Sequence, residues 1–248
     1  MSNKENINDT EFAPEKMLVC YNNDFELVES YKSIRTNIMY SMPRTEGGKV
    51  IVLTSSTANE GKSTTAINLA LTFAQVNAKV LLIDCDLRKS RLHRYLRIDR
   101  KDGVSNVLCG FSDLDKAIKV EVKENLDVLT AGDIPPNPAE LLQTEVFAKM
   151  IEELKKRYDY IIIDTPPINI VTDATFPIKL STGTILVIKK DFTTYDMIEH
   201  MLENIKCTGA NIIGTIMIDS KENANAVGYK SKYKYGSKYR YGSKYAYR

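Results

Sequence analysis

Residues 49–74 read KVIVLTSSTANEGKSTTAINLALTFA, which is an apolar run, a polar segment and a helical pattern in succession. The polar segment, residues 56–63, follows the phosphate-loop pattern G-x-x-x-x-G-K-[ST], with Ser56 in place of the first glycine. A loop of this kind wraps backbone N–H groups around a phosphate, and the helix behind it points its positive end at the same group. The alternative is a turn that ends in Gly-Lys-Ser by chance. The position of the motif, directly after an apolar strand and before a helix, argues against that alternative. The stretch therefore predicts a nucleotide site.

The side chains of the loop predict which atoms meet the nucleotide. We expect Lys62 to reach the β- and γ-phosphate oxygens and the Ser63 hydroxyl to ligate Mg²⁺. Lys62 is also a candidate catalytic residue, because its charge would stabilise the transferring phosphoryl group. The expected nucleotide-binding residues are Asn59, Glu60, Gly61, Lys62, Ser63 and Thr64.

Short apolar runs rich in Val and Ile recur along the rest of the chain. They do not alternate with polar residues, which is typical of strands buried on both faces of a parallel sheet. Helical patterns separate them near residues 62–76, 140–157 and 193–208. Alternation of strand and helix predicts an α/β fold with a doubly wound, mostly parallel sheet flanked by helices. The six runs occupy residues 49–56, 79–86, 126–133, 158–167, 182–191 and 211–219.

Acidic residues stand near the carboxyl ends of two of these runs. Asp84 and Asp86 are two residues apart, so we expect their side chains to project to the same side, and Asp164 ends another run. Because ligands gather at this edge of a parallel sheet, the three carboxylates and the phosphate loop should converge. A lone aspartate there is usually a turn or cap residue, but three beside a phosphate loop indicate a site. The candidate metal ligands are Ser63, Asp84 and Asp164, and the candidate catalytic base is Asp84 or Asp86.

The N-terminal part of the chain has one helical pattern. Residues 1–23 are polar and are expected to be loosely structured. The segment from 24 to 41 then repeats apolar residues with a helical period, which predicts an amphipathic helix. Its apolar face consists of Leu27, Tyr31, Ile34 and Ile38.

The last twenty residues, 229–248, hold seven of the fourteen tyrosines. They also carry seven Lys or Arg, no acidic residue and no Leu, Ile, Val, Phe or Met, and from Ser231 they form three six-residue units. Such a segment buries too little apolar surface to offset the entropy of ordering, so it is predicted to be disordered. Its phenols suit phosphate acceptors, a stacking surface for single-stranded nucleic acid, or a basic anchor on an anionic membrane.

The charge of the rest of the chain restricts these alternatives. The whole chain has a formal charge of +2, whereas residues 1–228 carry 27 Lys and Arg against 32 acidic residues. The basic character is therefore local, which weakens a nucleic-acid function for the protein as a whole. The sequence contains neither a signal-peptide pattern nor an apolar run of the roughly 20 residues that a membrane span needs, so we expect a cytoplasmic protein. The four cysteines lack metal-site spacing and are expected to be free thiols.

The combination of motifs resembles one family. A phosphate loop with Glu-Gly-Lys-Ser-Thr, LLIDCDLRKS at 81–90, YDYIIIDTPP at 158–167 and a terminal tyrosine cluster are similar to the bacterial tyrosine kinases of capsule and exopolysaccharide systems, of the CapB/CpsD type. The resemblance covers residues 25–248 and implies a P-loop fold related to MinD/ParA ATPases, with ATP and Mg²⁺ as cofactors. It makes the loop a Walker A motif, Asp84 and Asp86 the Walker A′ pair, and Asp164 the Walker B acid. It also implies phosphorylation between subunits of the tail tyrosines Tyr229, Tyr233, Tyr235, Tyr239, Tyr241, Tyr245 and Tyr247.

The resemblance further implies how the chain is organised. Relatives carry E-x-x-R-x-x-R in the N-terminal helix as a subunit contact of a ring, and an octamer is one candidate size. The corresponding residues here are Glu29, Lys32 and Arg35. Because Lys32 cannot copy a bidentate arginine contact, a solvated charged face is the alternative. The implied domains are an N-terminal segment with the oligomerisation helix, 1–45, a P-loop kinase domain, 46–222, and the tyrosine-rich tail, 223–248.

Family members in Gram-positive bacteria act together with separate proteins. The partners that the resemblance implies are a transmembrane activator, a cognate tyrosine phosphatase and protein substrates of polysaccharide synthesis, with no nucleic acid among them. The activator would hold the kinase at the inner face of the cell membrane through a cytoplasmic segment.

One position distinguishes these kinases from their ATPase relatives. MinD/ParA ATPases carry a second lysine, K-G-G-x-G-K, five residues before the phosphate-loop lysine, and this chain has Thr57 there. A sandwich-dimer mechanism that relies on that lysine lacks its residue here, which favours a kinase. The alternatives are a MinD/ParA-type ATPase that positions cargo, and a nucleic-acid- or membrane-binding module that acts through its tail.

Overall fold

The computed structural model describes residues 18–20, 24–43 and 46–219. Contacts between residues divide the chain into two units after Ile218, and the structural description that follows concerns the first unit. The seven tail tyrosines predicted as phosphate acceptors lie outside the described residues.

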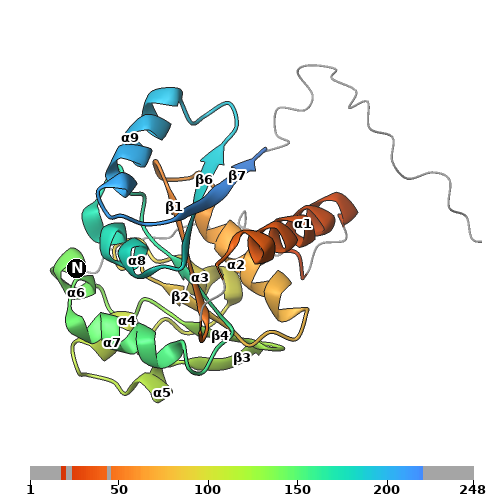
Figure 1. Ribbon diagram of the computed structural model, residues 1–248. Helices are drawn as coiled ribbons and strands as arrows, with labels where there is room; N and C mark the ends of the chain where they lie inside the picture. Colours follow the sequence, from red (N-terminus) through yellow and green to blue (C-terminus); the bar gives the residue numbers. More distant parts are fainter. Residues whose placement is uncertain (1–17, 21–23, 44–45, 220–248) are drawn as a thin grey trace, which may run out of the picture. The chain divides into compact units, whose positions relative to one another are not determined.

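Seven strands of the described residues form one sheet. They are β1 (Lys49–Ser55), β2 (Val80–Asp84), β3 (Lys119–Lys123), β4 (Leu126–Leu129), β5 (Tyr160–Asp164), β6 (Gly183–Lys189) and β7 (Ile212–Ile218). Their order in the sheet is β3-β4-β2-β5-β1-β6-β7, and every pair is parallel except β3 with β4 (Figure 1). The six apolar runs are the six parallel strands, which confirms the predicted fold class. β3 was not predicted, because KVEVK is a short edge strand whose side chains are partly exposed.

Helices pack on both faces of the sheet. In the described residues they are α1 (Phe25–Ser41), α2 (Lys62–Ala74), α3 (Leu92–Leu96), α4 (Val104–Leu108), α5 (Leu114–Ala117), α6 (Pro138–Leu142), α7 (Glu145–Leu154), the 3₁₀ turn η2 (Thr172–Ala174), α8 (Thr175–Leu180) and α9 (Tyr195–Lys206). α1, α2 and α3 cover one face, and α4 to α9 cover the other (Figure 1). This arrangement is a doubly wound sheet with a hydrophobic core on each side.

Residues of the central strands divide between these two cores. In β1, Val50 and Val52 join the core under α4 to α9, whereas Ile51 and Leu53 join the core under α1 and α2. All four side chains are fully buried. Burial of such a side chain stabilises the fold by about 1.5–3 kcal/mol relative to exposure. An unbroken apolar run is therefore what a central strand of this sheet requires.

The helix predicted over residues 140–157 is in fact two helices, α6 and α7. Pro138 stands in the first turn of α6, where a missing N–H costs nothing. Thr144 then interrupts the helical pattern, because its hydroxyl accepts the Phe147 N–H at 3.3 Å and caps α7. The helical spacing of apolar residues continues across Thr144, but the chain forms two helices there, because Thr144 is the N-cap of α7.

α1 packs its predicted apolar face into the core that also contains α2. Tyr31 and Ile38 are buried, and Leu27 and Ile34 pack at the margin of the same core. Asp24 caps the helix by accepting the N–H groups of its first turn. No helix within the described ranges is long and apolar enough to cross a membrane.

Candidate active site

The phosphate loop joins the carboxyl end of β1 to the first turn of α2. Gly61 is the residue before the helix and has φ +87°, a left-handed conformation that favours glycine. A Cβ at this position would lie 3.3 Å from the Ile218 side chain at the end of β7. Asn59 also has a positive φ, of 66°, which asparagine tolerates better than most residues. The residue types therefore fit the curvature of the loop.

Lys62 and Asp164 meet at the carboxyl edge of the sheet. Lys62 Nζ donates to Asp164 Oδ1 at 2.5 Å, and both side chains are buried. Burial raises the pKa of the Asp164 carboxyl, and the Lys62 ammonium opposes that rise. The second oxygen, Asp164 Oδ2, is buried without a hydrogen-bond partner among the described residues. A buried carboxylate oxygen without a donor is suited to accept a cation or a metal-bound water.

This donor set fits Mg²⁺ in its usual protein setting. The Ser63 hydroxyl lies beside the pair, 3.5 Å from Lys62 Nζ, and it interacts with the Asp164 carboxyl. Within the described residues no three His, Cys, Asp or Glu side chains converge into a metal cage. Mg²⁺ rarely uses such a cage, because it is typically held by one or two protein oxygens together with phosphates and water. Ser63 and Asp164 are the residues that would hold it.

Asp84 occupies the equivalent position on the neighbouring strand. It ends β2, and the register pairs it directly with Asp164 of β5. Its fully buried carboxylate accepts the Ser90 hydroxyl at 2.7 Å and the Asp86 N–H at 3.1 Å. Burial, and next the charge of Asp164, raise the pKa of Asp84 to about 7. A carboxyl with this pKa is able to exchange a proton near neutral pH.

Asp86 differs from Asp84 in a way that the two-residue spacing did not predict. β2 ends at Asp84, so the alternation of a strand no longer governs where the Asp86 side chain points. Asp86 is only partly buried, and its Oδ1 accepts the Lys89 N–H at 2.9 Å. Strand alternation therefore does not apply to Asp86, and a common direction of the two carboxylates stays a prediction. Asp84 is fully buried in the site, whereas Asp86 lies at its rim, where its charge still acts on the carboxyls of Asp84 and Asp164.

Residues that the sequence analysis did not single out hold the segment after β2. Arg88 makes two hydrogen bonds to Asp173 of η2, at 2.8 and 3.0 Å, and the Asp173 side chain is fully buried. Ser90, the donor to Asp84, lies 3.2 Å from His93 Nδ1. Arg88 and Asp173 are 85 positions apart in sequence, so no local pattern pairs them.

Three other residues of the loop have side chains that meet neighbouring groups or solvent. The buried carboxylate of Glu60 accepts hydrogen bonds from Ser56, Thr57 and Thr193, and contact of Glu60 with the nucleotide stays a prediction. Thr57, at the position of the second lysine of the ATPases, has a buried hydroxyl without a partner among the described residues. Asn59 is exposed, and its Oδ1 lies 3.4 Å from Arg91 Nη1. The loop is thus held by its own side chains and by neighbours.

The residues predicted for subunit contact lie along α1. Lys32 Nζ pairs with Glu29 Oε1 at 2.7 Å, and both side chains are about half exposed. Arg35 instead donates to the Thr72 carbonyl of α2 at 2.8 Å. One of the three charged residues is therefore used to attach α1 to the fold.

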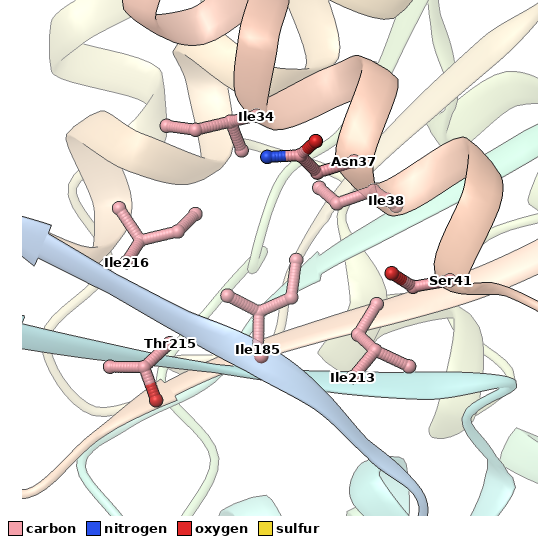
Figure 2. Close-up of a pocket in the computed structure, with 9 residues that line it drawn as sticks. Ile34, Asn37, Ile38, Ser41, Ile185, Ile213, Thr215 and Ile216 are labelled. Atoms are coloured by element: carbon pink, nitrogen blue, oxygen red, sulfur yellow. The ribbon is translucent and has the colours of Figure 1, made fainter.

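A separate apolar groove of about 240 Å³ lies between α1 and the edge of the sheet. Figure 2 shows Ile34 and Ile38 of α1 facing Ile185, Ile213 and Ile216 of the strands. None of the proposed phosphate or metal ligands lines it.

Comparison with known proteins identifies the family. The family model described as an AAA domain matches residues 48–218. The chain is 38% identical to the tyrosine-protein kinase YwqD of Bacillus subtilis, over 84% of this chain and 85% of that protein. It is 36% identical to the putative tyrosine-protein kinase CapB of Staphylococcus aureus, over 84% of this chain and 88% of that protein.

Solved structures agree with these relatives. The kinase domain of the Escherichia coli tyrosine kinase ETK has a TM-score of 0.78 and 28% identity, covering 95% of this chain and 89% of that one. The chimerical protein CapA2B2 has a TM-score of 0.76 and 35% identity, covering 82% and 89%. MinD of Pyrococcus horikoshii, complexed with Mg-ADP, has a TM-score of only 0.60 and 26% identity, covering 68% and 70%. The fold is thus that of a MinD-like P-loop protein, and the chain belongs to the bacterial tyrosine-protein kinases of the AAA-domain family.

Proposed function

We propose that this kinase transfers the γ-phosphoryl group of ATP to its own C-terminal tyrosines, from one subunit to another, and thereby regulates synthesis and export of a capsular or extracellular polysaccharide. The observation that carries the proposal is the juxtaposition of Lys62, the unpartnered oxygen of Asp164 and the buried Asp84 beside a phosphate loop. A cation, a metal-accepting oxygen and a carboxyl with a pKa near neutrality are the groups that phosphoryl transfer to a phenol requires.

Lys62 and the loop would bind and orient the phosphates of ATP. Lys62 is the first residue of α2 and its ammonium contacts Asp164, from where its charge would neutralise the γ-phosphoryl group. Ser63 and Asp164 would hold Mg²⁺, whose chemistry when bound is to offset the charge of the β- and γ-phosphates. Backbone N–H groups around Gly61 would complete the cradle.

Asp84 would take the proton of the attacking tyrosine. A phenol has an ordinary pKa near 10, so it attacks poorly at pH 7 unless a base accepts its proton. Asp84 has a pKa of about 7, which favours proton exchange at that pH. The Ser90 hydroxyl and the Asp86 N–H would fix the orientation of its carboxylate. Asp86, at the rim, would contact the acceptor segment.

The tail would supply the acceptors. Seven tyrosines among seven Lys and Arg form a long acceptor segment, and many equivalent acceptors raise the local concentration of substrate. Each phosphate adds about −1.5 to −2 charges, so a few of them overturn the positive charge of the tail. Because the remainder of the chain is acidic, a phosphorylated tail would be repelled by it. An unmodified tail would then hold an assembly together, and a phosphorylated tail would release it.

The proposed partners follow from the family. A ring-shaped homo-oligomer, with an octamer as one candidate size, would use Glu29, Lys32 and Arg35. A separate transmembrane activator would hold the kinase at the inner face of the cell membrane, and a tyrosine phosphatase would reset the tail. Protein substrates of polysaccharide synthesis would be further acceptors.

A mixing experiment tests transfer between subunits. A Lys62→Met chain with its tail intact is mixed with an active chain whose seven tail tyrosines are Phe, together with labelled ATP, Mg²⁺ and the activator segment. Transfer between subunits places label on the inactive chain. If that chain stays unlabelled at high protein concentration, transfer occurs within one chain.

Size measurements test the release step. The all-Phe chain should form the large assembly, and the fully phosphorylated wild type should form smaller species. Glu29→Ala with Lys32→Ala and Arg35→Ala should also give small species, because the interface would lose its charges. If modified and unmodified proteins have the same size, the charge switch is contradicted. The proposal that the protein is a kinase does not depend on this result.

A further inference from the structure

The turn between β6 and α9 carries a hydroxyl that is fixed from both sides. Phe192 N–H and Thr193 N–H both donate to the Lys189 carbonyl, at 3.2 and 2.9 Å, so the turn is closed on itself. The Thr193 hydroxyl accepts the Lys189 N–H at 2.9 Å, which leaves its own proton directed outward. That proton is donated to Glu60 Oε1 of the phosphate loop. Thr193 therefore connects two segments that are 133 positions apart.

Glu60 receives this hydrogen bond inside the phosphate loop. Its side chain is 1% exposed, and a carboxylate so deeply buried is costly unless donors surround it. Two donors come from the loop itself: the Ser56 hydroxyl at 2.9 Å and the Thr57 N–H at 2.7 Å. The third is Thr193. The carboxylate thus closes the loop on itself and attaches it to the β6–α9 turn at the same time.

A second contact supports the loop from the same side. The Lys190 N–H of the turn donates to the Ile218 carbonyl at 2.9 Å, and the Ile218 side chain lies against Gly61. The β6–α9 turn therefore supports the two consecutive loop residues before the lysine, Glu60 directly and Gly61 through Ile218. Those residues set the path by which the N–H groups of the loop reach a phosphate.

We propose that Thr193 is a positioning residue for nucleotide binding, which acts through Glu60 to keep the phosphate loop in the curvature that binds phosphate. The proposal rests on the proposed function, because it concerns the same nucleotide site. A preorganised loop binds the nucleotide before and during transfer alike. Loss of the Thr193–Glu60 contact should therefore weaken nucleotide affinity and change the rate at saturating ATP much less.

The neighbouring threonine provides a matched control. Thr194 also carries a hydroxyl in this turn, but it accepts the Met197 N–H at 3.3 Å and caps α9, away from the loop. Thr193→Val and Thr194→Val make the same chemical change one residue apart. A merely structural role of Thr193 would make the two variants behave alike.

The test measures the affinity of the full-length chain for Mg-ADP by calorimetry, together with thermal unfolding. Thr193→Val should weaken Mg-ADP binding about tenfold, as expected for loss of a hydrogen bond to a charged group. Thr193→Ser keeps the hydroxyl and should bind within about twofold of wild type. Thr194→Val should lower the unfolding temperature and leave Mg-ADP affinity at the wild-type value. Glu60→Ala, which removes the acceptor of the Thr193 hydroxyl, should also weaken binding, and addition of Thr193→Val to it should cause little further loss, because the two changes break one contact.

Three results would overturn the proposal. They are wild-type affinity in Thr193→Val, equal loss of affinity in Thr193→Val and Thr194→Val, and full additivity of Glu60→Ala with Thr193→Val. If Thr193→Val loses its cooperative unfolding transition, Glu60→Ala decides, since wild-type affinity in a variant without the acceptor excludes the contact from nucleotide binding. A wild-type chain that binds no Mg-ADP would refute the proposed function itself and this proposal with it.

Discussion

β2 and β5 end at equivalent positions of the sheet, but the aspartates at their ends have different hydrogen-bond partners. Asp84 and Asp164 close neighbouring parallel strands, are paired in register, and are both buried. Asp164 meets the ammonium of Lys62, whereas Asp84 meets a hydroxyl and N–H groups. The side chains that contact each aspartate, which come from other parts of the chain, therefore determine what its carboxylate is suited to do. Under the proposed function, the ammonium of Lys62 would keep the Asp164 carboxyl charged for Mg²⁺. Asp84 has no cation among the hydrogen-bond donors found for it in the described residues, and it would serve as the proton acceptor.

Replacement of Asp164 by Asn should have the largest effect. The change removes the negative partner of Lys62 and an oxygen suited to Mg²⁺ without changing the size of the side chain. We expect phosphotyrosine formation to fall at least about a hundredfold and Mg-ADP affinity to fall with it. Calorimetry and labelled-ATP assays measure the two effects. Asp127→Asn, near the amino end of β4, is the matched control, because Asp127 bonds to Tyr158 far from the site. Equal behaviour of the two variants would place the site elsewhere.

The same substitution at Asp84 should separate binding from transfer. An amide in place of the carboxylate cannot accept the phenol proton, so the transfer rate should fall about a hundredfold or more. Because Lys62, Ser63 and Asp164 stay in place, Mg-ADP affinity should remain within about threefold of wild type. Single-turnover transfer and nucleotide titration measure this difference. A variant that loses affinity as completely as Asp164→Asn would remove the distinction between the two strand ends.

Asp84 should also make the protein less stable at high pH. Because the folded-state pKa of Asp84 is raised to about 7, the folded chain binds this proton more tightly than the unfolded chain does. Its contribution to stability is therefore full below pH 4 and is lost as the pH rises through 7. In EDTA, Asp84→Asn should unfold at a higher temperature than wild type at pH 8 and at a similar temperature at pH 5. A wild type that is the more stable protein at pH 8 would contradict the assignment.

The smallest expected effect concerns the segment that carries Ser90 and Asp86. Arg88→Ala leaves the buried Asp173 carboxylate without its bidentate partner, and because Arg88 is nearly half exposed we expect a loss of only about 1–2 kcal/mol. Urea unfolding measures it. Arg157→Ala breaks a pair with the largely exposed Asp115 and should cost less than about 1 kcal/mol. Equal losses in the two variants would show that Arg88 does not hold the segment.

The sequence predicts those parts of the site that repeat a local pattern. The apolar run before Ser56, the Gly61-Lys62-Ser63 ending and the helix behind it define the phosphate loop within 26 residues. The carboxyl ends of parallel strands meet at one edge, so Asp84 and Asp164 could be placed together before their distance was known. In both cases the periodicity of a single segment, together with sheet geometry, is sufficient.

The rest depends on contacts between distant segments. Glu60 lies in a motif that suggests contact with phosphate, yet its carboxylate pairs with Thr193, which no local pattern connects to it. Strand alternation could not place Asp86, because β2 ends at Asp84. Thr144 was overlooked as a cap because the apolar period continues past it. A sequence pattern predicts on which side of an element a side chain lies. The residue that it contacts there depends on how distant segments pack in the fold.

Mapping of labelled phosphate shows whether the chain phosphorylates tyrosine at the carboxyl edge of the sheet. The full-length chain and its Lys62→Met variant are incubated with γ-labelled ATP, Mg²⁺ and the activator segment, and phosphorylated residues are mapped. We expect label on the tail tyrosines of the wild type and none on a Lys62→Met chain that is shown to be folded. ATP hydrolysis without phosphotyrosine would instead indicate a positioning ATPase. Wild-type labelling of the Lys62→Met chain would contradict the assignment of the carboxyl edge as the active site.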